Sequence, residues 1–279
     1  MSDHGSSRSI DTGTDHLLAE VSNGIATLTL NRPDRRNALS GDMLAGMRRA
    51  LEEFATAADV RCVVVTGAGG AFCAGGDVKS MAEGNAGGRQ ASFDERVHQQ
   101  RLDQRATSGV LWSMPKPTIA VLPGAAAGAG LSLALACDLR IAADNAVMTT
   151  AFARVGFSGD YGGTWFLTQL VGPAKAKELY YLSDKIDMAT AERLGLVNQV
   201  FLAAELEAGW RGVAARLASG PSIAYRFMKE NINRAAAGVD VGDCMDLEVT
   251  HHQHCGQTED HRNAAQAFVN KQEPVFSGR

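Results

Sequence analysis

One carboxylate stands among glycines and aromatic residues in the segment GFSGDYGGTW, residues 156–165. Asp and Gly are common turn residues, so the simplest role for Asp160 is to form a turn. A carboxylate beside Tyr161 and Trp165 could instead be desolvated, which raises its pKa and makes it a candidate for proton transfer. The segment alone leaves both interpretations open.

Two other glycine-rich segments each follow an apolar run and lead into a helix-like one. They are FCAGGD, residues 72–77, and GAAAGAG, residues 124–130. Small residues let a ligand approach the backbone, and N–H groups at a helix start attract negative charge. Neither segment is a P-loop, and the dinucleotide-binding spacing is not met. Tight helix packing explains each turn alone, but two turns followed by Asp160 in a third glycine cluster indicate a reaction centre.

The elements that position these turns follow from the hydrophobic pattern. Strands are expected at 25–30, 62–67 and 139–143, and within 116–124 and 196–201. Helices are expected after a Ser40 cap, over 93–114, over 131–137, from Pro173 and from an Asp187 cap to Gly195. Residues 82–92 resemble a mobile connection. The repeated unit of strand, glycine turn and helix predicts an α/β core at 15–215, a flexible tail at 1–14 and a helical extension at 216–279.

Composition excludes several classes of protein. The 279 residues carry a formal net charge of −4 and are 45% hydrophobic, which argues against a nucleic-acid-binding surface. No run of about 18 uninterrupted apolar residues predicts a membrane span, and the polar start lacks the apolar core of a signal peptide. Five scattered cysteines favour a reduced, cytoplasmic protein over a disulfide framework.

From about residue 17 to the end, the chain resembles the enoyl-CoA hydratase/isomerase family, the crotonase superfamily. The matching stretches, in family order, include LTLNRPDRRNAL, VVVTGAGGAFCAGGDVKSM, KPTIAVLPGAAAGAGLSLALACDLRIAA and AFVNKQEPVFSGR. The resemblance implies a ββα superhelix followed by a helical trimerisation region, assembled as a homotrimer or as a hexamer of two trimers. It also implies acyl-CoA thioester substrates, with coenzyme A as part of the substrate and no separate cofactor.

The same resemblance gives the two turns one role, as an oxyanion hole. By motif match, the backbone N–H groups of Ala74 and Ala129 hold the thioester oxygen while an enolate forms. Further residues fall at positions expected to bind the substrate: Gly75, Gly76 and Asp77 beside the first donor, and Arg35, Arg36 and Lys271 toward the polar end of coenzyme A. Turn hydrogen bonds are the simpler explanation for Asp77, and solvated charge is the simpler explanation for the three basic residues.

The chain departs from the hydratases at the two glutamates that orient water. Ser132 and Phe152 occupy those positions, and neither side chain is an effective acid or base at neutral pH. Asp160 lies where other branches carry their acid, and the stretch is similar to isomerases of phenylacetate breakdown. Tyr161 and Trp165 are expected to line the pocket with Ser132 and Phe152. A double-bond isomerase using Asp160 is therefore favoured.

Three alternatives stay open. They are an enoyl-CoA hydratase, a hydrolase or ring-opening enzyme with the same Asp, and a non-catalytic CoA-binding protein. Aroyl-CoA dehalogenases also carry an Asp at this place, as a nucleophile, but nothing else in the chain indicates a halogenated aromatic substrate.

A cluster near the C-terminus invites a metal interpretation. His251, His252, His254 and Cys255 include pairs with helical same-face spacing. They fall within the expected trimerisation helices, and no second ligand set accompanies them. No metal is expected.

Overall fold

A seven-stranded mixed sheet forms the centre of the computed structural model, which describes residues 7–77 and 91–279. The sheet order is β1-β2-β3-β4-β5-β7-β10, with β1 and β2 antiparallel to their neighbours and the other pairs parallel. The strands are β1 (Arg8–Ile10), β2 (Leu17–Ser22), β3 (Ile25–Leu30), β4 (Cys62–Gly67), β5 (Thr118–Leu122), β7 (Leu139–Ala143) and β10 (Gln199–Phe201). All the strands predicted from the hydrophobic pattern are present.

A second, three-stranded sheet holds the segments between the main strands. It consists of β6 (Ala126–Ala127), β8 (Val147–Thr149) and β9 (Ile186–Asp187) in the order β6-β8-β9. Because β6 lies inside the second glycine turn, this small sheet fixes that turn relative to the segments before and after it.

The helices of the core begin at the predicted caps. The Ser40 side chain accepts the Met43 N–H at 3.2 Å and starts α1 (Gly41–Thr56), and Asp187 accepts the Thr190 N–H and starts α7 (Met188–Arg193). Helix α5 (Ala129–Ala136) is buried along its whole length, as its small and apolar residues require. Helix α6 (Gly163–Leu182) is kinked at Gly172, so Pro173 begins its second half as predicted.

The prediction of a single helix over residues 93–114 is wrong. Two helices occupy that range, α3 (Phe93–Ala106) and α4 (Ser108–Ser113), and Thr107 separates them with φ −118° and ψ −89°. Thr107 is buried and its hydroxyl donates to the Asp103 carbonyl, so the chain turns there without glycine or proline.

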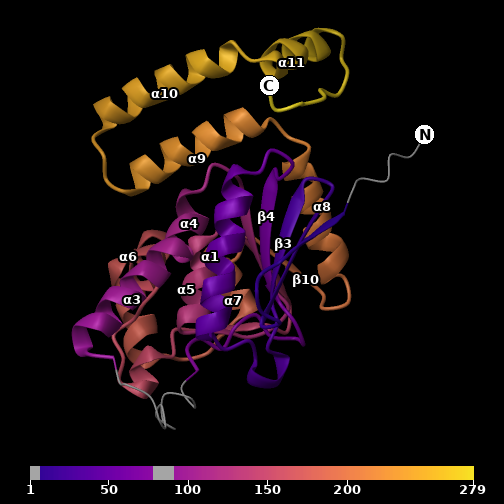
Figure 1. Ribbon diagram of the computed structural model, residues 1–279. Coiled ribbons are helices and arrows are strands. Elements are labelled where there is room, and N and C mark those ends of the chain that lie inside the picture. Colours follow the sequence, from indigo (N-terminus) through magenta and orange to yellow (C-terminus); the bar gives the residue numbers. More distant parts are fainter. Residues whose placement is uncertain (1–6, 78–90) are drawn as a thin grey trace.

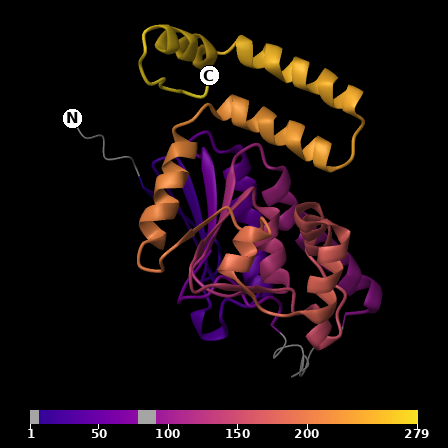
Figure 2. The same cartoon turned by 180° about the vertical axis from the view of Figure 1, so that it is seen from behind.

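The helices that leave the core begin at Ser222, after the predicted boundary at residue 215. That boundary falls within α8 (Leu206–Ala218), which packs on the main sheet through buried Trp210, Ala214 and Ala218. The helices that leave the core are α9 (Ser222–Ala236), α10 (Val241–Gly256) and α11 (Glu259–Val269). Figures 1 and 2 show α9 lying across one end of the core, with α10 and α11 on its far side.

The prediction of a flexible tail over residues 1–14 is also partly wrong. Residues Arg8–Ile10 form β1, and the Arg8 guanidinium pairs with Glu53 at 2.5 Å and with Asp59 at 2.7 Å. Most of the connection expected at 82–92 lies outside the described residues. Over residues 7–77 and 91–279, no helix is long and apolar enough to cross a membrane.

Candidate active site

The two glycine turns are joined to each other by main-chain hydrogen bonds. The N–H groups of Phe72 and Cys73 donate to the Ala125 carbonyl at 3.0 and 3.1 Å, and the Ala127 N–H donates to the Cys73 carbonyl at 2.9 Å. The turns that follow β4 and β5 are therefore one structural unit, as their sequences suggest.

Glycine is required where the two turns meet. Gly75 has φ +92°, and a Cβ there would lie 2.8 Å from the Ala127 carbonyl oxygen and 3.3 Å from the Ala129 nitrogen. A Cβ at Gly130 would overlap the carbonyl oxygen and the side chain of Cys73. Any side chain at either position would push the turns apart, so these glycines set the spacing between the backbone amides.

The predicted Ala74 donor is wrong, because its N–H is already used. It donates to the Arg36 carbonyl at 2.9 Å, and the Gly75 N–H points at the Cys73 sulfur at 3.4 Å. Within the described residues, the Gly76 N–H donates no hydrogen bond, and neither does the Ala129 N–H in the first turn of α5. The amides that remain available are thus those of Gly76 and Ala129.

Asp160 lies in the turn that starts α6, and its carbonyl accepts the Gly163 N–H at 3.0 Å. Its Oδ1 is buried and has no hydrogen-bond partner among the described residues. Burial raises the pKa of the Asp160 carboxyl to about 6. Burial, and to a lesser degree the Asp160 charge, raises the pKa of the Cys73 thiol to about 12.

Two predicted pocket residues join this arrangement. Ser132 is buried on α5, and a Cβ at Gly163 would overlap its Oγ, so the start of α6 lies directly against it. Phe152 is buried and approaches Gly128 of the second turn, where a Cβ would lie 3.8 Å from its ring. Tyr161 is buried as well, and its N–H donates to the Gln104 Oε1 at 2.6 Å. The hydroxyl of Ser132 therefore packs against the start of α6, and the Phe152 ring packs against the second glycine turn.

A family model described as enoyl-CoA hydratase/isomerase matches residues 20–279. The chain belongs to the enoyl-CoA hydratase/isomerase family. It is 37% identical to a probable enoyl-CoA hydratase of Rhodobacter capsulatus, over 93% of this chain and 97% of that protein. It is 33% identical to the 1,2-epoxyphenylacetyl-CoA isomerase of Escherichia coli, over 94% of this chain and 98% of that protein.

Solved structures agree with this assignment. The crystal structure of a putative enoyl-CoA hydratase from Streptomyces coelicolor superposes with a TM-score of 0.89, at 32% identity and over 100% of both chains. The crystal structure of a putative enoyl-CoA hydratase/isomerase from Mycobacterium abscessus superposes with a TM-score of 0.86, at 34% identity, over 94% of this chain and 100% of that chain. The crotonase fold expected from the sequence is thus confirmed, while the relatives' names include both hydratases and an isomerase.

The basic residues expected at the coenzyme A end lie in two places. Arg35 and Arg36 are exposed, and the Arg36 carbonyl touches the first turn through Ala74. Lys271 is exposed just after α11, and Figure 1 shows α11 on the far side of α9 from the core. The part that Lys271 plays in coenzyme A binding stays a prediction.

Asp77 and Trp165 are held by other contacts. Asp77 pairs with the Arg32 guanidinium at 3.1 Å, and that guanidinium also donates to the Ala38 carbonyl. The Trp165 ring packs edge-on against Trp112 and Phe166 and lines a cavity that does not include Asp160. The place of Trp165 in the candidate pocket stays a prediction.

Two contributors, Arg32 and Tyr180, are absent from the residues predicted from the sequence, and Gly76 was predicted in a different role. Gly76 was expected only as a substrate neighbour, and the Arg36 carbonyl contact that excludes Ala74 is visible only in three dimensions. Arg32 holds Asp77 across a separation of 45 residues. Tyr180, near the end of α6, stacks on Phe152 with centroids 5.7 Å apart. No local motif marks Tyr180, because the kink at Gly172 breaks the helical spacing that would relate it to Asp160.

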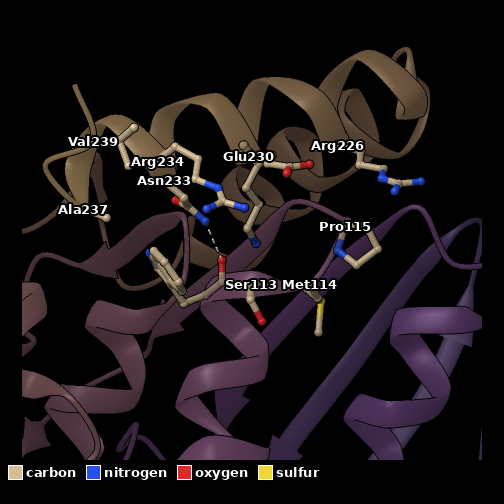
Figure 3. Close-up of a pocket in the computed structure, with 11 residues that line it drawn as sticks. Ser113, Met114, Pro115, Arg226, Glu230, Asn233, Arg234, Ala237 and Val239 are labelled. Carbon is tan, nitrogen blue, oxygen red and sulfur yellow. Dashed lines mark hydrogen bonds between the residues drawn. The ribbon is translucent and has the colours of Figure 1, made fainter. Parts of the chain in front are cut away.

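A cavity of about 550 Å³ lies elsewhere, between α9 and the segment Trp112–Pro115 (Figure 3). Two of its polar side chains are paired with the core: the Lys229 ammonium contacts Asp138 and the carbonyls of Leu111 and Lys116, and Asn233 donates to the Trp112 carbonyl. These contacts anchor α9 to the core.

The histidines near the C-terminus pack between helices. His251 is buried, its Nδ1 lies 2.6 Å from the Asn231 Oδ1, and its ring stacks on Phe227. His254 also stacks on Phe227. Across the part of the chain that the structure describes, no group of three or more His, Cys, Asp or Glu side chains could hold a metal ion.

Proposed function

We propose that this protein is a double-bond isomerase of acyl-CoA thioesters, with Asp160 as the group that moves the proton. The observation that carries the proposal is a carboxylate with one buried, unpaired oxygen and a raised pKa, in a chain whose two joined glycine turns leave the Gly76 and Ala129 amides without an acceptor among the described residues. A pKa near 6 leaves this carboxyl charged at neutral pH and basic enough to accept a proton.

The reaction needs one acid–base group and two amides. The Asp160 carboxylate removes a proton from a carbon of the acyl chain, and the electron pair of that C–H bond moves into the conjugated system as the thioester oxygen gains negative charge. The N–H groups of Gly76 and Ala129 donate to that oxygen. The protonated Asp160 then returns the proton two carbons away, and the double bond shifts. Atoms and charge balance without a separate cofactor.

Hydration is the second candidate, because several relatives are named hydratases. Water addition across the double bond requires a group that orients the water as well as one that delivers a proton. Ser132 and Phe152 supply no carboxylate for this, so we expect little hydration of crotonyl-CoA. Turnover near the common enzyme value of about 10 per second would favour the hydratase instead.

The remaining features of the proposal concern binding and assembly. We infer that Arg35 or Arg36 meets the polar end of coenzyme A at the first turn. Lys271 would do so from a neighbouring copy in a homotrimer or hexamer. Lys271→Ala should then weaken acyl-CoA affinity while leaving turnover at saturation near the parent value.

The decisive test is Asp160→Asn on a panel of enoyl-, dienoyl- and ring-CoA thioesters. Asn keeps the size and the turn-forming ability of Asp but removes the base, so turnover should fall by about 10²–10⁴-fold. Asp144→Asn is the matched control, since Asp144 is exposed and its Oδ1 accepts the Ala203 N–H, a bond that Asn retains. A folded Asp160→Asn variant with parent turnover would make Asp160 a turn residue. If the parent instead catalyses hydrolysis or ring opening, and Asp160→Asn abolishes that activity, the reaction differs from the one proposed but Asp160 keeps its role.

A further inference from the structure

Tyr180 reaches the candidate site from the far end of α6. Its ring lies parallel to Phe152, with an interplanar angle of 7°. Its hydroxyl lies over the turn that contains Asp160: a Cβ at Gly163 would be 2.9 Å from Oη, and one at Gly159 would be 3.5 Å from it. The hydroxyl is therefore held between the two glycines that flank Asp160.

The Tyr180 hydroxyl is available as a donor. No hydrogen bond joins it to another group within residues 7–77 and 91–279, and the Ser132 Oγ, which also lies close to the Gly163 position, donates to the Gly128 carbonyl at 3.3 Å. Burial and the Asp160 charge raise the pKa of the Tyr180 phenol, so the proton stays on its oxygen at neutral pH. Among the described residues, the Tyr180 hydroxyl is thus a donor without an acceptor, and the Asp160 Oδ1 is a buried acceptor without a donor.

The other titratable groups around Asp160 do not fill this role. Tyr161 follows Asp160 directly, and burial with the charges of Asp160 and Asp103 raises the pKa of its phenol. Cys73 reaches the site from the first turn, and its thiol is a weak donor. Of the groups that sense the Asp160 charge, Tyr180 is the one on a separate element whose hydroxyl packs over the Asp160 turn.

We propose that Tyr180 is a positioning residue, whose hydroxyl donates a hydrogen bond to the Asp160 carboxylate once an acyl-CoA thioester fills the pocket. This inference rests on the proposed function. Catalytic hydrogen bonds are often long in a free enzyme and tighten in the complex. The bond favours the charged, proton-accepting form of Asp160 and holds the carboxylate in one orientation toward the acyl chain.

Tyr180→Phe isolates the hydroxyl, because Phe keeps the ring stacked on Phe152. Tyr181→Phe is the matched control: its side chain is the next along α6 and is 72% exposed. The pH dependence of kcat reports the complex, and that of kcat/KM the free enzyme. In Tyr180→Phe we expect the acidic limb of the kcat profile to move up by about half a pH unit or more, since the charged form has lost a donor. The value of kcat should fall about tenfold with KM near the parent value. Tyr181→Phe should match the parent.

A second measurement does not depend on turnover. With a saturated acyl-CoA bound, carboxyl-carbon NMR should show Asp160 titrating at higher pH in Tyr180→Phe than in the parent, with Asp160→Asn identifying the signal. Bound thioester with identical titration and identical kcat in both proteins would overturn the role of Tyr180 and leave the proposed function standing. If acyl-CoA binds and the titration shifts but no thioester isomerises, the isomerase proposal fails and the contact stands. A protein that binds no acyl-CoA overturns both.

Discussion

Asp160 combines a cost to stability with a gain in reactivity. A carboxyl whose Oδ1 is buried without a hydrogen-bond partner is poorly solvated when charged. The same desolvation that destabilises the anion raises its affinity for a proton. The feature that makes this residue a base therefore makes it unfavourable for the folded state at neutral pH.

Because the pKa of Asp160 is raised in the folded protein, the stability of the fold depends on pH. The folded pKa is about 6, above the ordinary value of about 4, so the folded protein holds the proton more tightly between these pH values. The stability contributed by this carboxyl is present below about pH 4 and is lost as pH rises through 6. Asp160→Asn should therefore unfold at a higher temperature than the parent at pH 8, with the difference shrinking toward pH 4.5. Thermal melts at the two pH values measure it; a variant that is equally or less stable at pH 8 contradicts the desolvation argument.

At the scale of elements, the joined turns depend on Gly75. Gly75→Ala should lower activity by about 10²–10³-fold, because a Cβ 2.8 Å from the Ala127 carbonyl forces the backbone to shift and moves the Gly76 amide. Gly70→Ala is the control: Gly70 also has positive φ, at +77°, but a Cβ there meets no atom within 4 Å. That variant should lose about 1 kcal/mol of stability and keep its turnover. Turnover assays and melting curves of both variants distinguish the crowding at Gly75 from the backbone strain that both positions share. Equal activities of Gly75→Ala and Gly70→Ala would contradict the role of the turn.

The attachment of α9 depends on an ion pair. Lys229 and Asp138 lie 2.9 Å apart with side chains 9% and 26% exposed, and α9 has no buried residue of its own. Lys229→Met should cost about 3 kcal/mol, because it leaves the Asp138 carboxylate without its cation. Denaturant unfolding measures the loss, and Lys229→Met with Asp138→Asn should recover part of it. Additive losses would show that the two side chains do not interact.

The elements follow from local chemistry more closely than the site does. Ser40 and Asp187 start helices because their side chains cap the next turn, and such signals lie within four residues of each other. The helix break at Thr107 could not be predicted, because a Thr hydroxyl that donates to the carbonyl four residues earlier also occurs inside continuous helices. Asp160 could be singled out as the candidate acid because it is the one carboxylate in its glycine-rich segment, and its role as the acid stays a prediction. The choice between Ala74 and Gly76 could not, because a carbonyl from residue 36 decides it.

At the scale of the whole molecule, the C-terminal helices expose an apolar surface. On α9 it comprises Met228 and Ile232, 53% and 67% exposed, and on α10 it comprises Val241, Met245 and Val249, 72%, 62% and 54% exposed. The i, i+4 spacing places each set on one side of its helix. An apolar stripe of this kind is typical of an interface between subunits, which fits the predicted trimer.

Introducing charge into this stripe should weaken the assembly. Light scattering should give the parent as a trimer or a pair of trimers, and Ile232→Glu with Met245→Glu as smaller species at micromolar concentration. Leu202→Glu is the control, an exposed apolar residue in the loop before α8. A monomeric parent would refute the trimer, and an unchanged assembly in the double variant would place the interface elsewhere.

The hydrogen bonds between the two glycine turns have a consequence for heredity. They join main-chain atoms of Phe72, Cys73, Ala125 and Ala127, which every residue except proline provides in the same form. A single codon change can exchange the acid at position 160 or the side chains at 132 and 152, but it cannot remove an amide without inserting proline. As long as Gly75 and Gly130 are kept, descendants of this chain can therefore change which proton is moved while the amides stay in place, and a lineage can diversify its chemistry on an inherited backbone.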